Sequence, residues 1–230
     1  MTPRRLVRFT VAISALLGAV GCQSTSGDQL RASLVKTDTE RSQELYLSVI
    51  EQLIENGKAH AAMAHLDEYD RLNGASPRSR KLRADAWFAM GDLGQAEKGY
   101  QSITEARNSG FGQHGLGRVA AARGNWALAS TYFEQAVRAQ PTNAHFLNDF
   151  GCALYRTERF DEAEFELRKA LELSPLDAEV TNNILVLLAK SGRTDRFSSI
   201  FADMTDTAAR ETLRSRLASY VRGGDKAGTP

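Results

Sequence analysis

An all-α fold built from repeats is the architecture that this sequence predicts, and three observations support it. The 230-residue chain has long stretches of Ala, Leu, Glu and Arg and only five prolines, a composition that favours helices. Residues of matching size recur at intervals of 34 positions, which is the mark of a repeat architecture. With 42% apolar and 25% charged residues, the chain also has the composition of a globular protein with one substantial core.

Charge and motif content exclude several classes of function. A formal net charge of +1 gives no field that would draw the chain onto nucleic acid. Cys22 and Cys152 are too few for a disulfide framework, and four scattered histidines offer no metal site. No nucleotide-binding fingerprint, glycine-framed serine nucleophile or paired-histidine zinc motif is present. We therefore expect a protein that is not an enzyme, with no cofactor, no metal and no small-molecule substrate.

The first 21 residues have the pattern of an export signal. Arg4, Arg5 and Arg8 precede an apolar run over residues 9–20. This run of about 12 residues fits a secretory signal, whereas a transmembrane helix needs roughly 20 apolar residues. We therefore assign residues 1–21 to a signal peptide.

The end of this signal resembles a bacterial lipobox, because the small residues Ala19 and Gly21 precede Cys22. The resemblance implies cleavage before Cys22 and acylation of that cysteine, although Ala19 stands where the pattern most often has Leu. Gln23 is not the aspartate that retains lipoproteins in the inner membrane, so the same resemblance favours the outer membrane, with the rest of the chain in the periplasm. An ordinary secretory signal, an uncleaved anchor and a twin-arginine signal remain alternatives.

Two central repeats carry the strongest signal. Every member of the first set lies 34 residues before its counterpart in the second: Gly117, Ala129, Phe133, Ala136 and Pro141 against Gly151, Ala163, Leu167, Ala170 and Pro175. The register extends in both directions, so that the five units begin near positions 43, 77, 110, 144 and 178. In the second unit Ala84 stands where the glycine is expected, and in the fifth unit Phe197 stands where a small residue is expected.

These spacings resemble the tetratricopeptide repeat. The resemblance implies a right-handed solenoid of antiparallel helix pairs, called here helix A and helix B of each repeat. Glycine and alanine would allow the helices to approach closely, and each proline would end a helix B. We expect a lipidated flexible tether over residues 22–40, repeats over 41–204, a capping helix over 205–221 and a flexible tail over 222–230.

The resemblance also implies a concave groove lined by the A helices, in which a segment of a partner protein binds. Asparagine side chains in such a groove match a peptide bond, arginine pairs with a carboxylate, and aromatic rings provide apolar anchors. The inward positions are Lys81, Asp85, Phe88, Phe111, His114, Arg118, Asn148, Asp149, Tyr155, Asn182, Asn183 and Val186. They do not reproduce the Lys and Asn pattern by which some of these repeats hold a C-terminal carboxylate.

Cys152 lies beside Gly151 in the helix A pattern of the fourth repeat. A small side chain suits close packing there, so we interpret Cys152 as a buried free thiol. A redox-sensitive contact is the alternative.

The whole chain, with its lipobox, short tether, repeats and capping helix, resembles the TadD lipoproteins of the tight-adherence (Flp pilus) system. That resemblance implies an adaptor that helps to assemble the pilus apparatus through its secretin. The pilotin of type IV pili, which is also a lipoprotein of such repeats, is the nearest alternative. A periplasmic scaffold for envelope enzymes is another, and an enzyme using Asp85, Arg118 or Asp149 in the groove is a third.

Overall fold

The computed structural model describes residues 25–104, 109–196, 200, 207, 208, 210–212, 214, 215 and 218, in which all regular secondary structure is helical. The chain divides into two units, Met1–Leu45 and Tyr46–Pro230. The predicted signal peptide, Cys22 and the tail over 222–230 lie outside the described residues. None of the helices in the described part of the chain is long and apolar enough to span a membrane.

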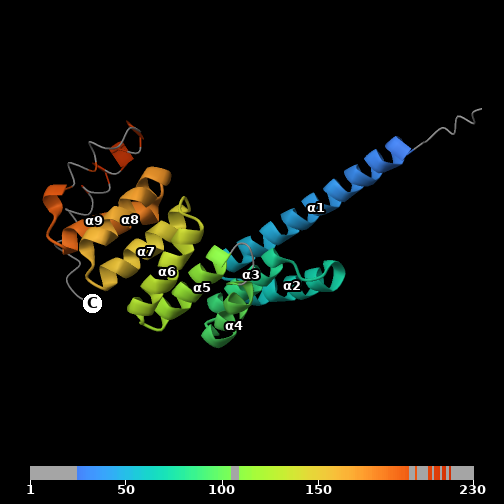
Figure 1. Ribbon diagram of the computed structural model, residues 1–230, viewed down its shortest axis with the longest axis horizontal. Helices are drawn as coiled ribbons and strands as arrows, with labels where there is room; N and C mark the ends of the chain where they lie inside the picture. Colours follow the sequence, from blue (N-terminus) through green and yellow to red (C-terminus); the bar gives the residue numbers. More distant parts are fainter. Residues whose placement is uncertain are drawn as a thin grey trace, which may run out of the picture. The chain divides into compact units, whose positions relative to one another are not determined.

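The second unit is a series of helix pairs in which helices that follow one another in sequence also pack together (Figure 1). The A helices are α3 (Pro77–Ala89), α5 (Ser109–Ala122), α7 (Ala144–Arg156) and α9 (Ala178–Lys190). The B helices are α2 (Ala59–Asn73), α4 (Leu93–Thr104), α6 (Trp126–Ala139) and α8 (Phe160–Leu173). These A helices begin within one residue of the predicted unit starts. The all-α solenoid is therefore confirmed.

Helix α1 (Thr25–Glu55) differs from the sequence prediction. Residues 22–40 were expected to form a flexible tether, but the described part of that segment, from Thr25, is helical and continues into helix A of the first repeat. The physical reason lies in the composition, because no proline or glycine interrupts the chain between Gly27 and Gly57 and helix-favouring residues fill the interval. Residues 37–41 are exposed, as a solvated segment should be.

The C-terminal end is described only in part. Helix α9 and the turn at Gly192 follow the fifth-repeat pattern, and a short 3₁₀ helix covers Thr194–Arg196. Phe197 lies outside the described residues. Within the predicted capping helix, residues 207, 208, 210–212, 214, 215 and 218 are helical, and its apolar residues Leu213, Leu217 and Tyr220 lie outside the described residues.

The helix ends follow the residues predicted to cause them. Helices α6 and α8 end two residues before Pro141 and Pro175, since proline disfavours a helical residue before it. Four of the five turns between helix A and helix B contain a glycine with positive φ, as at Gly91 (80°) and Gly192 (73°). The fourth turn instead places Glu158 at φ 61°, a conformation that costs a side-chain-bearing residue free energy.

Close packing within a repeat depends on a missing side chain. A Cβ atom added at Gly117 would lie 2.5 Å from the ring of Phe133, and one added at Gly151 would lie 2.6 Å from Leu167 Cγ. In the second repeat Ala84 replaces the helix A glycine, and Gly99 in helix B supplies the space instead, because a Cβ there would lie 2.8 Å from that of Ala84. The predicted close approach of the two helices is therefore present in all three repeats.

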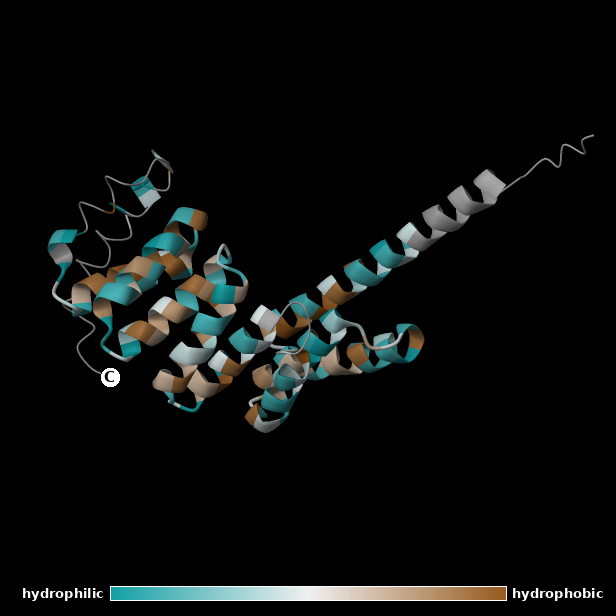
Figure 2. Cartoon of the chain, in the orientation of Figure 1, coloured by the Kyte–Doolittle hydropathy of each residue, from teal (hydrophilic) through white to brown (hydrophobic). Residues whose placement is uncertain are grey.

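Apolar side chains gather between the helices. Figure 2 shows hydrophobic and hydrophilic stretches alternating along the helices of the second unit, as expected for amphipathic helices. The largest cluster spans the third to fifth repeats and includes Phe133, Leu154, Leu167 and Ile184, which are nearly fully buried. This core holds the A helices side by side, so their remaining faces are available for a site.

Candidate functional site

Two hollows lie along the A helices of the second unit. The first hollow has a volume of about 530 Å³ and is lined from α1, α3, α4, α5 and α7. Six predicted groove residues line it: Lys81, Asp85, Phe88, Phe111, His114 and Arg118. The second hollow, of about 390 Å³, is lined by Phe88 and Arg118 again and by the predicted residues Asp149 and Asn183. Eight of the twelve predicted side chains therefore border the two hollows.

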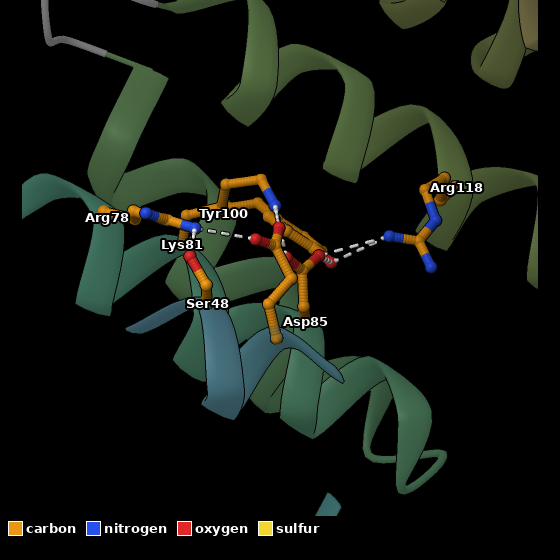
Figure 3. A network of polar contacts seen from close by, with 7 residues as sticks. Ser48, Arg78, Lys81, Asp85, Tyr100 and Arg118 are labelled. Atoms are coloured by element: carbon orange, nitrogen blue, oxygen red, sulfur yellow. Dashed lines mark hydrogen bonds and ion pairs between the residues drawn. The ribbon is translucent and has the colours of Figure 1, made fainter. Parts of the chain in front are cut away.

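Asp85 is the centre of a polar network in the first hollow (Figure 3). Its carboxylate, whose side chain is 13% exposed, accepts from Tyr100 Oη at 2.6 Å, Lys81 Nζ at 2.8 Å and Arg118 Nη1 at 3.1 Å. Burial, and then the nearby Asp85 carboxylate, raise the pKa of Tyr100 well above its ordinary range, so its hydroxyl stays a donor. Three helices are thus joined through one carboxylate.

The same network continues toward the first repeat. Lys81 Nζ lies 3.6 Å from Glu51 Oε1, and Arg78 Nη2 donates to Glu51 Oε2 at 2.9 Å and to Ser48 Oγ at 3.1 Å. These contacts connect helix A of the first repeat to helix A of the second. The charges that border the first hollow are therefore largely paired with one another.

Two of the cations also lie over aromatic rings. The guanidinium carbon of Arg118 is 4.2 Å from the ring centroid of Phe88, and Lys81 Nζ is 5.7 Å from that of Phe111. Both distances fall within the range of a cation–π interaction. Arg118 is thereby held on one side by Asp85 and on the other by Phe88, with its side chain 34% exposed.

His114 connects the third repeat to the fourth. Its Nε2 lies 2.8 Å from Asp149 Oδ2, and its ring stacks on Phe146 with centroids 4.5 Å apart. The ring of Phe133 lies 5.4 Å from the same imidazole. His114 therefore borders the first hollow while it fixes Asp149 at the edge of the second.

Asn148 is buried rather than presented to a partner. It is 2% exposed, and its Nδ2 donates to Asp149 Oδ1 and Glu179 Oε1, both at 3.3 Å, while its Oδ1 accepts from Asn183 Nδ2 at 2.9 Å. The repeat register placed this amide in the groove, where it would bind a partner's backbone. The next repeat instead brings Asn183 and Glu179 close enough to satisfy it within the chain.

The remaining predicted residues lie outside both hollows. Tyr155 is half-buried, and its ring packs against Phe160 of the same repeat with centroids 6.0 Å apart. Asn182 is exposed and Val186 is half-buried. These three positions share the helix A location of the other candidates, but neither hollow brings them together with those residues.

Trp126 and Glu179 border the second hollow and were not predicted from the sequence. Trp126 is the first residue of a helix B, and the prediction of groove residues considered helix A positions alone. Its ring already carries a cation, because the guanidinium carbon of Arg156 lies 5.1 Å from the centroid. Glu179 lies in the first turn of α9, where its carboxylate resembles an ordinary favourable helix-start residue.

Cys152 borders the second hollow and is a half-buried free thiol. Burial first, and then the carboxylates of Asp149 and Glu179, raise the pKa of Cys152 to about 12. The side chain therefore carries its proton at neutral pH, and a protonated thiol is a poor nucleophile. Within the described residues, no cluster of His, Cys, Asp or Glu is placed to hold a metal ion.

Comparison with known proteins supports the repeat interpretation at several levels. The tetratricopeptide repeat profile matches residues 114–178 and 148–203. A TPR repeat-containing protein of Pseudomonas aeruginosa, PA4299, is 33% identical over 180 residues, which cover 78% of this chain and 70% of that protein.

Solved structures share the fold at low identity. The thermophilic TPR protein TTC0263 of Thermus thermophilus is 20% identical with a TM-score of 0.60, covering 78% of this chain and 99% of that one. PilF of Pseudomonas aeruginosa is 14% identical with a TM-score of 0.59, covering 82% of this chain and 88% of that one.

Proposed function

Because this chain belongs to the tetratricopeptide-repeat family, we propose that it is an adaptor that binds a segment of another protein along its two hollows. Repeats of this family serve in protein–protein interaction, and the fold is typically a non-catalytic scaffold. Stacked repeats present an extended surface to which a partner segment can lie parallel.

The observation that carries the proposal is the composition of the first hollow. Apolar atoms form most of its lining, with Phe88, Phe111 and Phe146 among the residues, and oriented polar groups such as Asp85 and Arg118 stand among them. Binding sites in proteins have this combination of apolar walls and few fixed polar groups. At about 530 Å³, the hollow has room for apolar side chains of a bound segment.

Site-specific photo-crosslinking in intact cells tests this proposal. A crosslinking amino acid placed at Phe88 or Phe111 should capture one discrete partner protein. The matched control position is Phe165, which is 62% exposed on helix α8 and borders neither hollow. Absence of capture from the first two positions, or equal capture from Phe165, would contradict binding in the hollows.

Substitution of the asparagines provides a second test of partner binding. Asn182 and Asn183 changed together to Ala should weaken partner retention in a pull-down, because Asn183 borders the second hollow. This variant and the triple variant that adds Asn148→Ala should both lower thermal stability, because Asn183 donates to the buried Oδ1 of Asn148 and the amide of Asn148 is bonded within the chain. Unchanged retention by the folded triple variant would remove these residues from the binding surface.

We further propose that the protein is a lipoprotein of the outer membrane, anchored through Cys22 with the repeats in the periplasm. The support is the lipobox resemblance and Gln23, and several acyl chains on one cysteine would hold the protein durably. Metabolic labelling with a fatty-acid analogue should mark the native protein and not Cys22→Ser. Recovery of the labelled protein in the inner-membrane fraction would contradict the assigned location.

We assign the partner to a pilus assembly system, with the tight-adherence secretin apparatus as the first candidate and the type IV pilus as the second. The support is the resemblance of the whole chain to TadD lipoproteins. The likeness to PilF, at 14% identity, supports the shared fold and does not separate the two systems. Deletion should abolish Flp fibrils and preserve twitching motility, whereas the reverse result would favour the pilotin role.

Two other functions are distinguished by a deletion phenotype in one case and by the contacts of Asp85 in the other. A scaffold for envelope enzymes would leave pili intact and alter cell shape or detergent sensitivity. In an enzyme that used Asp85, proton transfer would have to displace the three donors that contact this carboxylate. The contacts of this carboxylate support a structural role rather than proton transfer.

A further inference from the structure

Two carboxylates border the second hollow. The carboxylates of Asp149 and Glu179 come from helix A of consecutive repeats, and both accept from the single amide of Asn148. Among the residues that the structure describes, neither carboxylate lies within ion-pairing distance of a Lys or Arg. In the part of the chain that the structure describes, the basic side chain that contacts the Asp149 carboxylate is the imidazole of His114.

Two acceptor atoms in this hollow have no partner in the described part of the chain. Glu179 accepts through Oε1 only, which leaves Oε2. Asn183 donates through Nδ2 to Asn148, so the atom that it has left over is the oxygen Oδ1. A ligand that satisfies these atoms must bring donors.

The first hollow provides the contrast. There Asp85 forms ion pairs with Lys81 and Arg118, and Glu51 forms an ion pair with Arg78. Arg118 also borders the second hollow, but its charge is paired with Asp85 and its guanidinium lies on Phe88. Of the two carboxylates that border the second hollow, Glu179 has no ion pair in the described part of the chain and Asp149 has only His114, so the charge left for a ligand there is negative.

The walls of the second hollow suit a long side chain with a charged end. Phe88, Trp126 and Phe133 provide aromatic surface in a volume of about 390 Å³, and Arg118 and Arg156 already lie over the rings of Phe88 and Trp126. Lys and Arg combine an aliphatic stem with a head that only donates hydrogen bonds. Asp and Glu only accept when ionised, so they would repeat the groups that are already there.

We propose that the second hollow binds a lysine or arginine side chain of the partner segment, whose apolar residues lie in the first hollow. This inference rests on the proposed adaptor function and adds the chemistry of the partner. Asp149, Glu179 and Asn183 contact the basic head, and the aromatic walls contact its stem. Asn148 and His114 are positioning residues, because each acts on the ligand through the acceptors that it orients.

Selection from a random peptide library tests the inference even while the natural partner is unidentified. The full chain is immobilised through a C-terminal tag, and the enriched peptides are sequenced. The wild-type chain should enrich peptides with a Lys or Arg near apolar residues. The variant Asp149→Asn with Glu179→Gln should lose the preference for basic residues and retain the apolar preference.

A matched control is available in the fourth repeat. Glu158→Gln with Glu172→Gln removes the same two charges from exposed residues that border neither hollow, and it should enrich the same peptides as the wild type. Thermal melts of both double variants identify any loss of folding. The single variant Glu179→Gln, in which Asp149 keeps its carboxylate, should retain part of the basic preference.

An affinity measurement then gives the size of the effect. Replacing the basic residue of an enriched synthetic peptide by norleucine should weaken binding to the wild type by about tenfold or more, the value of a charge-assisted contact. The same replacement should have little effect on binding to the charge-neutral variant. Raising the salt concentration should weaken only the interaction with the wild type appreciably.

The outcomes separate the two proposals. Peptides without a basic preference, or a preference that persists in the Asp149→Asn, Glu179→Gln variant, would overturn the basic-residue inference and leave the adaptor function standing. No enrichment over a Phe88→Ala, Phe111→Ala variant would overturn both. Loss of the preference in the first variant, with retention in the control, supports the inference.

Discussion

The second and third repeats carry an aromatic residue at the same position of helix B, but the two rings pack against different helices. Phe133 lies against Gly117 in helix A of its own repeat. Tyr100, 33 residues earlier, lies against Gly115 in helix A of the following repeat, where an added Cβ would overlap its ring. One ring therefore stabilises a helix pair, and the other joins two pairs.

Because the Tyr100 ring packs toward the next repeat, its hydroxyl group reaches the polar side chains of the first hollow. Tyr100 Oη donates to Asp85 at 2.6 Å and lies 3.5 Å from Arg118 Nη1. A ring that packs toward the next repeat thus brings a donor to the polar network of the first hollow. A packing residue of this repeat therefore also organises the binding surface.

Truncation of the rings should have the largest effect. Phe133→Ala removes a ring that is 3% exposed and should lower the free energy of unfolding by about 3–5 kcal/mol. Tyr100→Ala should cost a similar amount and also release Arg118 from part of its network. Chemical denaturation measures both losses. A loss below about 1 kcal/mol for either variant would show that its ring contributes little to packing.

Filling the glycine sites should have a smaller effect. Gly117→Ala places a methyl group 2.5 Å from the Phe133 ring and should cost about 1–3 kcal/mol. Gly94→Ala is the matched control in an α-helix, since its Cβ would meet only Asp92 Oδ1 at 3.6 Å. The control should gain up to about 1 kcal/mol, and equal losses in the two variants would contradict the packing argument.

The contact between Ala84 and Gly99 tests whether the glycine that permits close packing can lie in either helix of the pair. Gly99→Ala should lower the free energy of unfolding by about 1–2 kcal/mol, because the two methyl groups would be 2.8 Å apart. Adding Ala84→Gly should restore most of the loss, as coupling between neighbours requires. Additive losses in the double variant would show that the two positions are independent.

Removing only the hydroxyl of Tyr100 isolates its polar role. Tyr100→Phe keeps the ring and should cost about 1 kcal/mol, the net value of one hydrogen bond. A double-mutant cycle with Asp85→Asn measures the coupling directly. Zero coupling would show that Tyr100 contributes to this hollow through packing alone.

Much of this fold is readable from the sequence because the repeat restricts residue size at particular positions. Gly151, Ala163 and Pro175 each mark a close contact or a helix end, and the structure places them there. The extent of α1 was not predictable in this way, since no stop residue distinguishes its repeat portion from the residues before it.

The sequence predicts several of the residues that line the two hollows and misses others. Helix A positions identified Asp85, Phe88 and Arg118, because they depend on the repeat register alone. The burial of Asn148 depends on Asn183 and Glu179 from the next repeat, which a single-repeat pattern does not describe. Trp126 enters the second hollow from helix B, so no rule about helix A includes it.

The fourth turn, where Glu158 adopts a left-handed backbone, leaves the protein below the stability that its architecture permits. The equivalent turns use glycine, so Glu158→Gly should raise the melting temperature slightly, by relieving about 1 kcal/mol of strain. Selection for heat resistance, in nature or in the laboratory, would therefore find an adaptive step at this position that leaves the binding surface unaltered.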